Sequence, residues 1–176
     1  MADNYVTQTV FNVRNPRGIP GQVARDFPQQ FSADVGITNG TLKSGQGVTI
    51  IQNADGILVI AEPSDRKEVN GIVLFDASKF QDGDAFQRVT FESGDTVSVM
   101  RTGFIYVLAT DATNIINDTT VAPDIGGAPD TFNPYTTVVP PSDGRFSFIQ
   151  AKEGVISGDN RVFAVRINYQ STTVLT

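Results

Sequence analysis

The sequence predicts an all-β protein, folded as a compact sandwich or barrel of short antiparallel strands. Short apolar runs recur along the 176 residues, and breaks rich in Gly, Asp and Asn separate them. Residues of these types supply turn conformations, so many short strands joined by turns are expected. No apolar periodicity is long enough for a core helix. We expect an extended arm over residues 1–30 and a single β domain over residues 31–176, with a loop insertion at about 109–145.

The clearest strand is expected at residues 162–169, where apolar and polar side chains alternate. Alternation of this kind is typical of a strand with one buried and one solvated face. Arg166 would lie on the solvated face. The buried face would consist of Phe163, Val165, Ile167 and Tyr169.

Two hairpins are expected from turn sequences between apolar runs. One joins residues 47–52 to residues 56–61 through Asn-Ala-Asp-Gly, and the other joins residues 96–100 to residues 104–108 through Arg-Thr-Gly. Residues 69–75 are mostly apolar, which predicts a strand buried on both faces. The other expected elements are strands at 146–150 and 136–139, and single helical turns at 64–69, with Ser64 as N-cap, and at 110–117.

The sequence contains no His, no Cys and no Trp. There is therefore no Ser-His-Asp triad, no thiolate nucleophile and no zinc site of the usual kind. Four carboxylates in the insertion could bind a hard cation, but their spacing does not require one, and a solvated acidic loop is the simpler interpretation. We predict no catalytic residue, no cofactor and no metal site. The four residues are Asp111, Asp118, Asp124 and Asp130.

The charge balance argues against several classes of partner. Thirteen Lys and Arg face nineteen Asp and Glu, a net charge of −6. Binding to nucleic acid or to an anionic membrane surface normally requires a basic patch. No apolar run reaches the ~18 residues of a membrane helix, and the N-terminus lacks the features of a signal peptide. Charged residues make up 18% of the chain, which is low. A surface so poor in charge either contacts other proteins or is a neutral β-protein surface.

Two segments depart from the strand pattern. Residues 1–30 are polar and contain three Pro, which fix φ and remove donors, so an extended arm is expected. This arm is either a frayed terminus or a segment that becomes ordered on a partner. Residues 109–145 hold five Asp and five Pro, and no basic residue before Arg145. A loop of that length is usually functional or an insertion.

Several short motifs follow one another in an informative order. They are Pro-Gly-Gln at 20–22, Gly-Ile-Val at 71–73, Gly-Asp-Thr-Val-Ser-Val at 94–99, Gly-Phe-Ile-Tyr-Val at 103–107, Gly-Arg-Phe at 144–146 and a closing strand at 160–167. Over roughly residues 14–168 this order resembles the structural cement, or head decoration, proteins of tailed bacteriophages. The acidic insertion and the residues after Tyr169 depart from the family pattern.

The resemblance implies a capsid decoration protein rather than an enzyme. Such a protein binds the outside of an expanded phage head and bridges neighbouring major coat proteins, which stabilises the head against the pressure of packed DNA. It would be made in the host bacterial cytoplasm and located on the outer head surface of the virion. The expected partners are the major capsid protein and further copies of this chain, as a trimer by preference and a dimer as the alternative. Neither nucleic acid nor membrane is an expected partner.

Candidate contact residues come from position and residue type. In the arm, apolar side chains would anchor on the coat protein, and two arginines would pair with its carboxylates. These capsid-binding candidates are Phe11, Val13, Arg14, Arg17 and Ile19. The closing strand and tail would hold the copies together through Phe163, Val165, Tyr169, Val174 and Leu175.

Three other interpretations remain open at this point. A phage tail or fibre module, structural or receptor-binding, would also be β-rich, acidic and free of Cys, although fibres tend to show repeats and this chain shows none. A metal-dependent β-barrel enzyme would need convergent Asp residues and a phosphate- or sugar-binding loop, and no such loop is evident. A carbohydrate-binding module is the third, and the absence of Trp counts against it.

Overall fold

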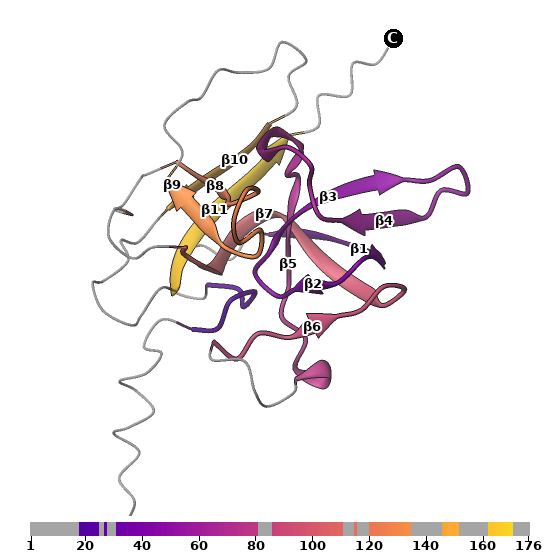
Figure 1. The fold of residues 1–176 in the computed structure, drawn as a ribbon, viewed down its shortest axis with the longest axis horizontal. Helices are drawn as coiled ribbons and strands as arrows, with labels where there is room; N and C mark the ends of the chain where they lie inside the picture. Colours follow the sequence, from indigo (N-terminus) through magenta and orange to yellow (C-terminus); the bar gives the residue numbers. More distant parts are fainter. Residues whose placement is uncertain are drawn as a thin grey trace, which may run out of the picture.

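The computed structural model describes residues 18–24, 27, 31–80, 86–110, 115, 120–134, 146–151 and 162–170. These residues form strands and two short 3-10 helices, which confirms the predicted all-β class (Figure 1). The elements are β1 (Ser32–Asn39), β2 (Leu42–Lys43), β3 (Gly47–Gln52), β4 (Leu58–Ala61), η2 (Arg66–Glu68), β5 (Gly71–Val73), η3 (Ala77–Lys79), β6 (Thr90–Phe91), β7 (Thr96–Leu108), β8 (Val121–Pro123), β9 (Phe132–Pro134), β10 (Phe146–Ala151) and β11 (Val162–Gln170). Within the described residues, no helix has the length and apolar character needed to cross a membrane.

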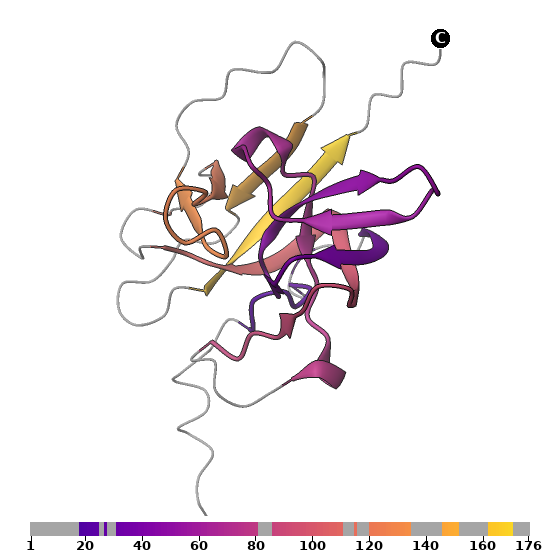
Figure 2. The same cartoon turned by 45° about the vertical axis from the view of Figure 1, so that its right-hand side comes forward.

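Five strands close into a barrel (Figures 1 and 2). Around the ring, β1 pairs with β4, β4 with β3, β3 with β5, β5 with β7, and β7 returns to β1. The pairing of β1 with β4 is parallel, and the other four are antiparallel. Beyond β7, the strands β11 and β10 continue the sheet outside the ring. The barrel alternative is therefore the correct one.

The longest strand, β7, belongs to both parts of the sheet. Its first half pairs with β1 and its second half with β11. The hairpin expected around residues 101–103 is wrong, because β7 runs through them without reversing. Gly103 has a φ of +141°, and a Cβ there would lie 2.6 Å from the Cβ of Phe31. The glycine thus permits a close approach between chain segments, not a turn.

Other predicted elements are confirmed. The hairpin of β3 and β4 has the expected turn, and the strands at 146–150 and 162–169 are β10 and β11. The helical turn at 64–69 is present as η2, which begins at Arg66, so Ser64 lies two positions before the helix and not directly next to it. The Ser64 N–H and the Ser64 hydroxyl both donate to the Glu68 carboxylate, at 3.1 and 2.8 Å. The strand at 136–139 and nearly all of the turn at 110–117 lie outside the described residues.

Apolar side chains form three clusters. The barrel interior contains Leu42, Val48, Ile60, Val73, Val89, Phe91, Val97 and Val99. A second cluster contains Val69, Ile72, Met100, Ile105, Val107, Ala109, Ile115, Val121, Phe132, Phe163, Val165 and Ile167. Because Ile72 and Val73 face different clusters, β5 is buried on both faces as predicted. A third cluster contains Ala24, Tyr106, Leu108, Val162 and Ala164.

The third cluster corrects the expectation for the closing strand. Phe163, Val165 and Ile167 share a buried face as predicted, but Val162 and Ala164 on the opposite face are buried as well. Arg166 is exposed. The opposite face is not solvated along its whole length, because Ala24 packs against it.

The insertion is only partly a loop. Strands β8 and β9 form a hairpin, and Ile115, Val121 and Phe132 are buried in the second cluster. Between the two strands, Asp130 accepts hydrogen bonds from Lys43 Nζ at 3.0 Å and from Arg88 at 2.6 Å. Residues 120–134 therefore form part of the core and are tied to the barrel by ion pairs.

Candidate functional site

The described acidic residues of the insertion have structural partners. Asp124 accepts hydrogen bonds from the Thr110 hydroxyl at 3.3 Å and the Ala128 N–H at 3.4 Å, while Asp130 pairs with two cations. Asp111 and Asp118 lie outside the described residues. Within those residues, no group of three or more potential ligands could hold a metal ion. The features left to consider as a site are surfaces that could bind another macromolecule.

One such surface is an apolar face on the outside of the barrel. We define the apolar face as Val35, Ile37, Ile51, Ile57 and Val59. Four of these side chains remain exposed, by 58% for Val35, 41% for Ile37, 55% for Ile51 and 45% for Ile57. Val35 and Ile37 lie on β1, Ile51 lies on β3, and Ile57 directly precedes β4. Exposed apolar patches of this kind typically mark sites of protein contact.

The strand register brings the apolar face together. Ile37 of β1 is paired with Val59 of β4, and Val59 is paired with Ile51 of β3. Directly paired residues project from the same face of a sheet, so these three side chains form one row. Val35 lies two positions before Ile37 on β1, and the alternation of side chains puts it on the same face. Ile57 lies two positions before Val59, directly ahead of β4, and is exposed as well.

The strand positions beside the apolar face are uncharged, and the charge of Asp55 lies at the hairpin tip. On β7, Thr96 is paired with Ile37 and Ser98 with Val35, and both are exposed. At the other end, Ala61 is paired with both Asn39 and Thr49. Neither residues 35–39 of β1 nor the residues paired with them on β4 and β7 carry a charge. By contrast, 18% of the residues in the whole chain are charged.

The hairpin that carries Ile51 and Ile57 projects from the barrel (Figure 1). Its turn is closed by hydrogen bonds from the Asn53 N–H to the Ile57 carbonyl at 2.9 Å and from the Gly56 N–H to the Asn53 carbonyl at 3.0 Å. The Asn53 side chain also accepts from the N–H groups of Asp55 and Ile57, at 3.0 and 2.9 Å. These bonds fix the exposed tip, so its apolar side chains are held in place.

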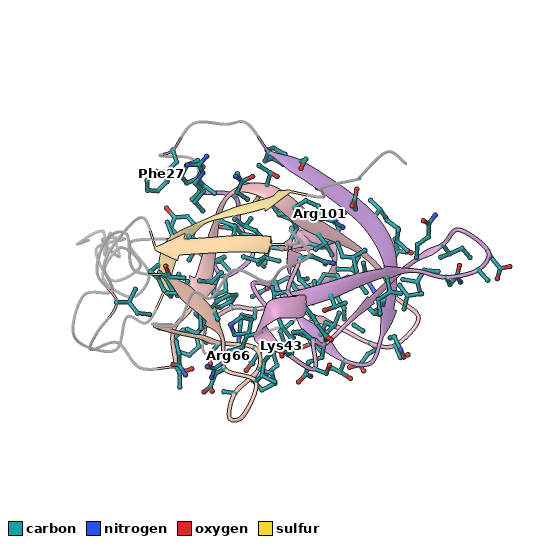
Figure 3. All side chains as sticks on the ribbon, turned by 90° about the horizontal axis from the view of Figure 1, so that it is seen from above. Phe27, Lys43, Arg66 and Arg101 are labelled. Carbon is teal, nitrogen blue, oxygen red and sulfur yellow. The ribbon has the colours of Figure 1, made fainter. Side chains whose placement is uncertain are left out.

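A second feature is the attachment of the N-terminal arm. The Gly21 N–H donates to the Tyr106 carbonyl at 2.7 Å, the Tyr106 N–H to Gln22 at 3.0 Å, and the Ala24 N–H to Phe104 at 2.9 Å. Residues 21–24 thus extend the sheet beside β7. The Phe27 ring, labelled in Figure 3, stacks on Phe104 with centroids 5.0 Å apart. The end of the expected arm is therefore part of the folded domain.

A groove opens next to this attachment. Its volume is about 1260 Å³, and its lining includes Gly21, Phe31, Phe75, Lys79, Asp95 and Ser98. Lys79 and Asp95 form an ion pair at 2.6 Å, and their side chains are 35% and 31% exposed, respectively. The hydrogen bond from Lys79 and the one from the Glu92 N–H lower the pKa of Asp95. The lining also includes Asp76, so it carries two carboxylates and one ammonium group.

The predicted contact residues fall in different places. Ile19 is half-buried, and its carbonyl accepts from the Gln22 N–H at 2.9 Å, while the other four capsid-binding candidates, Phe11, Val13, Arg14 and Arg17, lie outside the described residues. Phe163 and Val165 are 0% exposed within a single copy. Their side chains are therefore not available at the surface as an oligomer contact. The side chain of Tyr169, together with Val174 and Leu175, lies outside the described part.

Sequence reasoning missed the apolar face because it missed β1. The segment Ser32–Asn39 contains Asp34 and Gly36, and both residue types are uncommon in strands. Its alternating apolar residues were a usable signal, but alternation alone would have placed Val35 and Ile37 inside. Val35 and Ile37 instead face outward, because Gly36 between them faces inward, where a Cβ would lie 2.6 Å from the Leu58 carbonyl oxygen.

Comparison with known proteins gives the family. The family model described as "Structural cement protein (E217 gp24/Pam3 gp6)" matches residues 6–168. The chain belongs to this family. The cement protein is thus a structural component of a phage capsid, found in the virion, and the family is not one of enzymes.

One solved phage structure supports the fold of this cement protein. A chain of the capsid of Myoviridae phage XM1 is 18% identical, with a TM-score of 0.56, and the match covers 85% of this chain and 89% of that one. A chain of the head fibre gp8.5 N base of bacteriophage phi29 is 15% identical, with a TM-score of 0.37, over 81% and 99% of the two chains. No curated protein sequence matches.

Proposed function

We propose that this cement protein binds the outer surface of an expanded phage head and bridges neighbouring major coat proteins. The observation that carries the proposal is the family match over residues 6–168, which includes the barrel and the end of the arm. The bridge would resist separation of the coat subunits, and so would stabilise the head against the pressure of packed DNA.

The attachment of the arm supports this role. Gly21, Gln22 and Ala24 are bonded to the backbone of β7, so the residues before them start from a fixed point on a rigid barrel. Residues 1–17 can then reach a coat subunit while the barrel stays on its neighbour. Arg14 and Arg17 would pair with coat-protein carboxylates, and Phe11 and Val13 would supply apolar contacts. An extended segment can also add a strand to an exposed sheet edge of the partner.

Binding of this kind stabilises by linkage. A ligand that binds the assembled lattice, and not the separated subunits, shifts the equilibrium towards the lattice. Copies that are joined to one another bind with a high effective concentration, so a modest affinity for each coat contact is sufficient. A trimer at a lattice axis is the preferred arrangement, with a dimer as the alternative.

The proposal is tested by comparing two coat-protein preparations. The purified cement protein is mixed with expanded, undecorated heads of the parent phage and, separately, with dissociated coat subunits, and bound protein is quantified after sedimentation or size separation. We expect saturable binding to heads at a fixed ratio to coat protein and much weaker binding to subunits. Equal binding to both would contradict the lattice-bridging mechanism. Recovery of the protein with tails, and none with heads, would instead favour a tail or fibre module.

A further inference from the structure

The exposed apolar side chains of the described residues are concentrated on one side of the molecule. Six large apolar side chains are exposed in this part of the chain, and four of them belong to the apolar face; the other two are Phe31 and Phe80. The strand register makes the face continuous, with Ile37, Val59 and Ile51 in one row. Water contact with so much apolar surface is unfavourable, and burial against another protein would remove it.

Other faces of the sheet are already covered by the chain itself. The arm residue Ala24 packs on one side of β7 and β11, and Phe132 of β9 packs on the other. As a result, Phe163 and Val165 of the closing strand are inside the molecule. A contact between copies therefore cannot use these two side chains and needs a different surface.

Charge indicates which partner the apolar face fits. The chain carries a net charge of −6, so two copies repel each other unless the surfaces that meet are free of like charges. The apolar face has no charged member, and its paired neighbours Thr96 and Ser98 are uncharged. Asn39 and Thr49, which are paired with the adjacent Ala61, are uncharged as well, and the charge of Asp55 lies at the hairpin tip. When two copies meet around a twofold axis, the same patch faces itself, and charges there would be placed against identical charges.

We propose that the apolar face is the contact between two copies of this cement protein around a twofold axis, which corresponds to the dimer alternative. Val35, Ile37, Ile51, Ile57 and Val59 then meet the same residues of the second copy. Interfaces between identical subunits are richer in apolar area and poorer in charge at their centre than other protein surfaces, as this face is. The hydrogen-bonded turn at Asn53 holds Ile51 and Ile57 in position, which limits the entropy lost on association. The inference rests on the proposed function in one respect, which is that a lattice-binding protein gains from linked copies.

The test measures the self-association of the purified full chain, without heads. Light scattering after size exclusion and sedimentation velocity, over a wide range of concentration, give the mass of the wild type, of Ile51→Glu and of Phe80→Glu. Ile51 and Phe80 are 55% and 41% exposed, so neither change places a charge in the core, and Phe80 lies outside the apolar face. Circular dichroism and thermal unfolding check that both variants fold.

We expect the wild type to be a dimer that dissociates on dilution, and a trimer would overturn the twofold contact. Ile51→Glu should raise its dissociation constant by about tenfold or more, because the new carboxylate would be buried against its own copy. Phe80→Glu should leave the constant unchanged. A wild type that is monomeric at every concentration would overturn the inference, as would an Ile51→Glu variant that assembles normally. If that variant assembles normally and loses only head binding, the apolar face contacts the coat protein instead. Loss of assembly with head binding retained at high concentration would support the inference while leaving the proposed function intact.

Discussion

Arg88 and Asp130 are joined by an ion pair of 2.6 Å, although 42 residues separate them in the chain. Arg88 precedes β6 at the barrel, and Asp130 lies between β8 and β9 of the insertion. The Arg88 side chain is only 9% exposed. Together with Lys43, labelled in Figure 3, the pair fastens the insertion to the barrel.

Removing the Asp130 charge should destabilise the cement protein. In Asp130→Asn, the largely buried Arg88 side chain loses the charge of Asp130, and we expect a loss of about 1.5–3 kcal/mol in the free energy of unfolding. Denaturant unfolding followed by circular dichroism measures it. Asp55→Asn, at the exposed tip of the β3–β4 hairpin, is the control and should change stability by less than about 0.5 kcal/mol. Equal effects of the two changes would show that the ion pair contributes little.

The same carboxylate should make stability depend on pH. Burial raises the pKa of Asp130, but the hydrogen bond from Lys43 and the charges of Arg88 and Lys43 outweigh it, so the pKa is lowered. The stabilisation is therefore fully present above the unfolded pKa of about 3.9 and is lost as pH falls through the lower folded value. The difference in unfolding free energy between wild type and Asp130→Asn should stay constant from neutral pH down to about pH 5 and shrink below pH 4. A difference that grows on acidification would have the wrong sign for this account.

The attachment of the arm depends on Gly21. Gly21 and Gly94 both have a φ of +91°, but a Cβ at Gly21 would lie 2.8 Å from the Phe75 backbone nitrogen, whereas a Cβ at Gly94 would meet nothing within 4 Å. Both alanine variants carry the strain of positive φ, about 1 kcal/mol, and only Gly21→Ala adds the clash. We expect a larger loss of stability in Gly21→Ala and faster hydrogen exchange at the Tyr106 N–H, which bonds to Gln22. If the two variants behave alike, close packing of the arm is not what requires glycine at position 21.

The strands that the sequence predicts well are those whose pattern is local. The β3–β4 hairpin has its turn residues between two apolar runs, and β11 alternates between apolar and polar residues from Val165 to Tyr169. The insertion was misread because Val121 and Phe132 are separated by a Pro-, Gly- and Asp-rich turn, and their burial depends on strands distant in the chain. Likewise, the apolar face is formed by the pairing of β1 with β4, and no short stretch of sequence contains both. The barrel and the apolar face both depend on the register between strands that are distant in the chain, and local periodicity does not encode that register.

Truncation should separate folding from head binding. A chain without residues 1–17 keeps the hydrogen bonds of Gly21 and Ala24 to β7, so its thermal midpoint should be close to that of the full chain. Its affinity for expanded heads should fall at least about tenfold, because the proposed anchors Phe11, Val13, Arg14 and Arg17 are removed. Head binding is measured by co-sedimentation. Unchanged binding by the truncated chain would rule out the arm as a major capsid contact.

The central claim is that this cement protein strengthens the head, and a heat challenge tests it most directly. Expanded, undecorated heads are heated alone and after saturation with the full chain, and the temperature at which the shells disrupt is followed by light scattering and electron microscopy. The account predicts that saturated heads survive to a higher temperature, with the increase levelling off at the stoichiometry where binding saturates. Heads that bind the protein to saturation and still disrupt at the same temperature would contradict it.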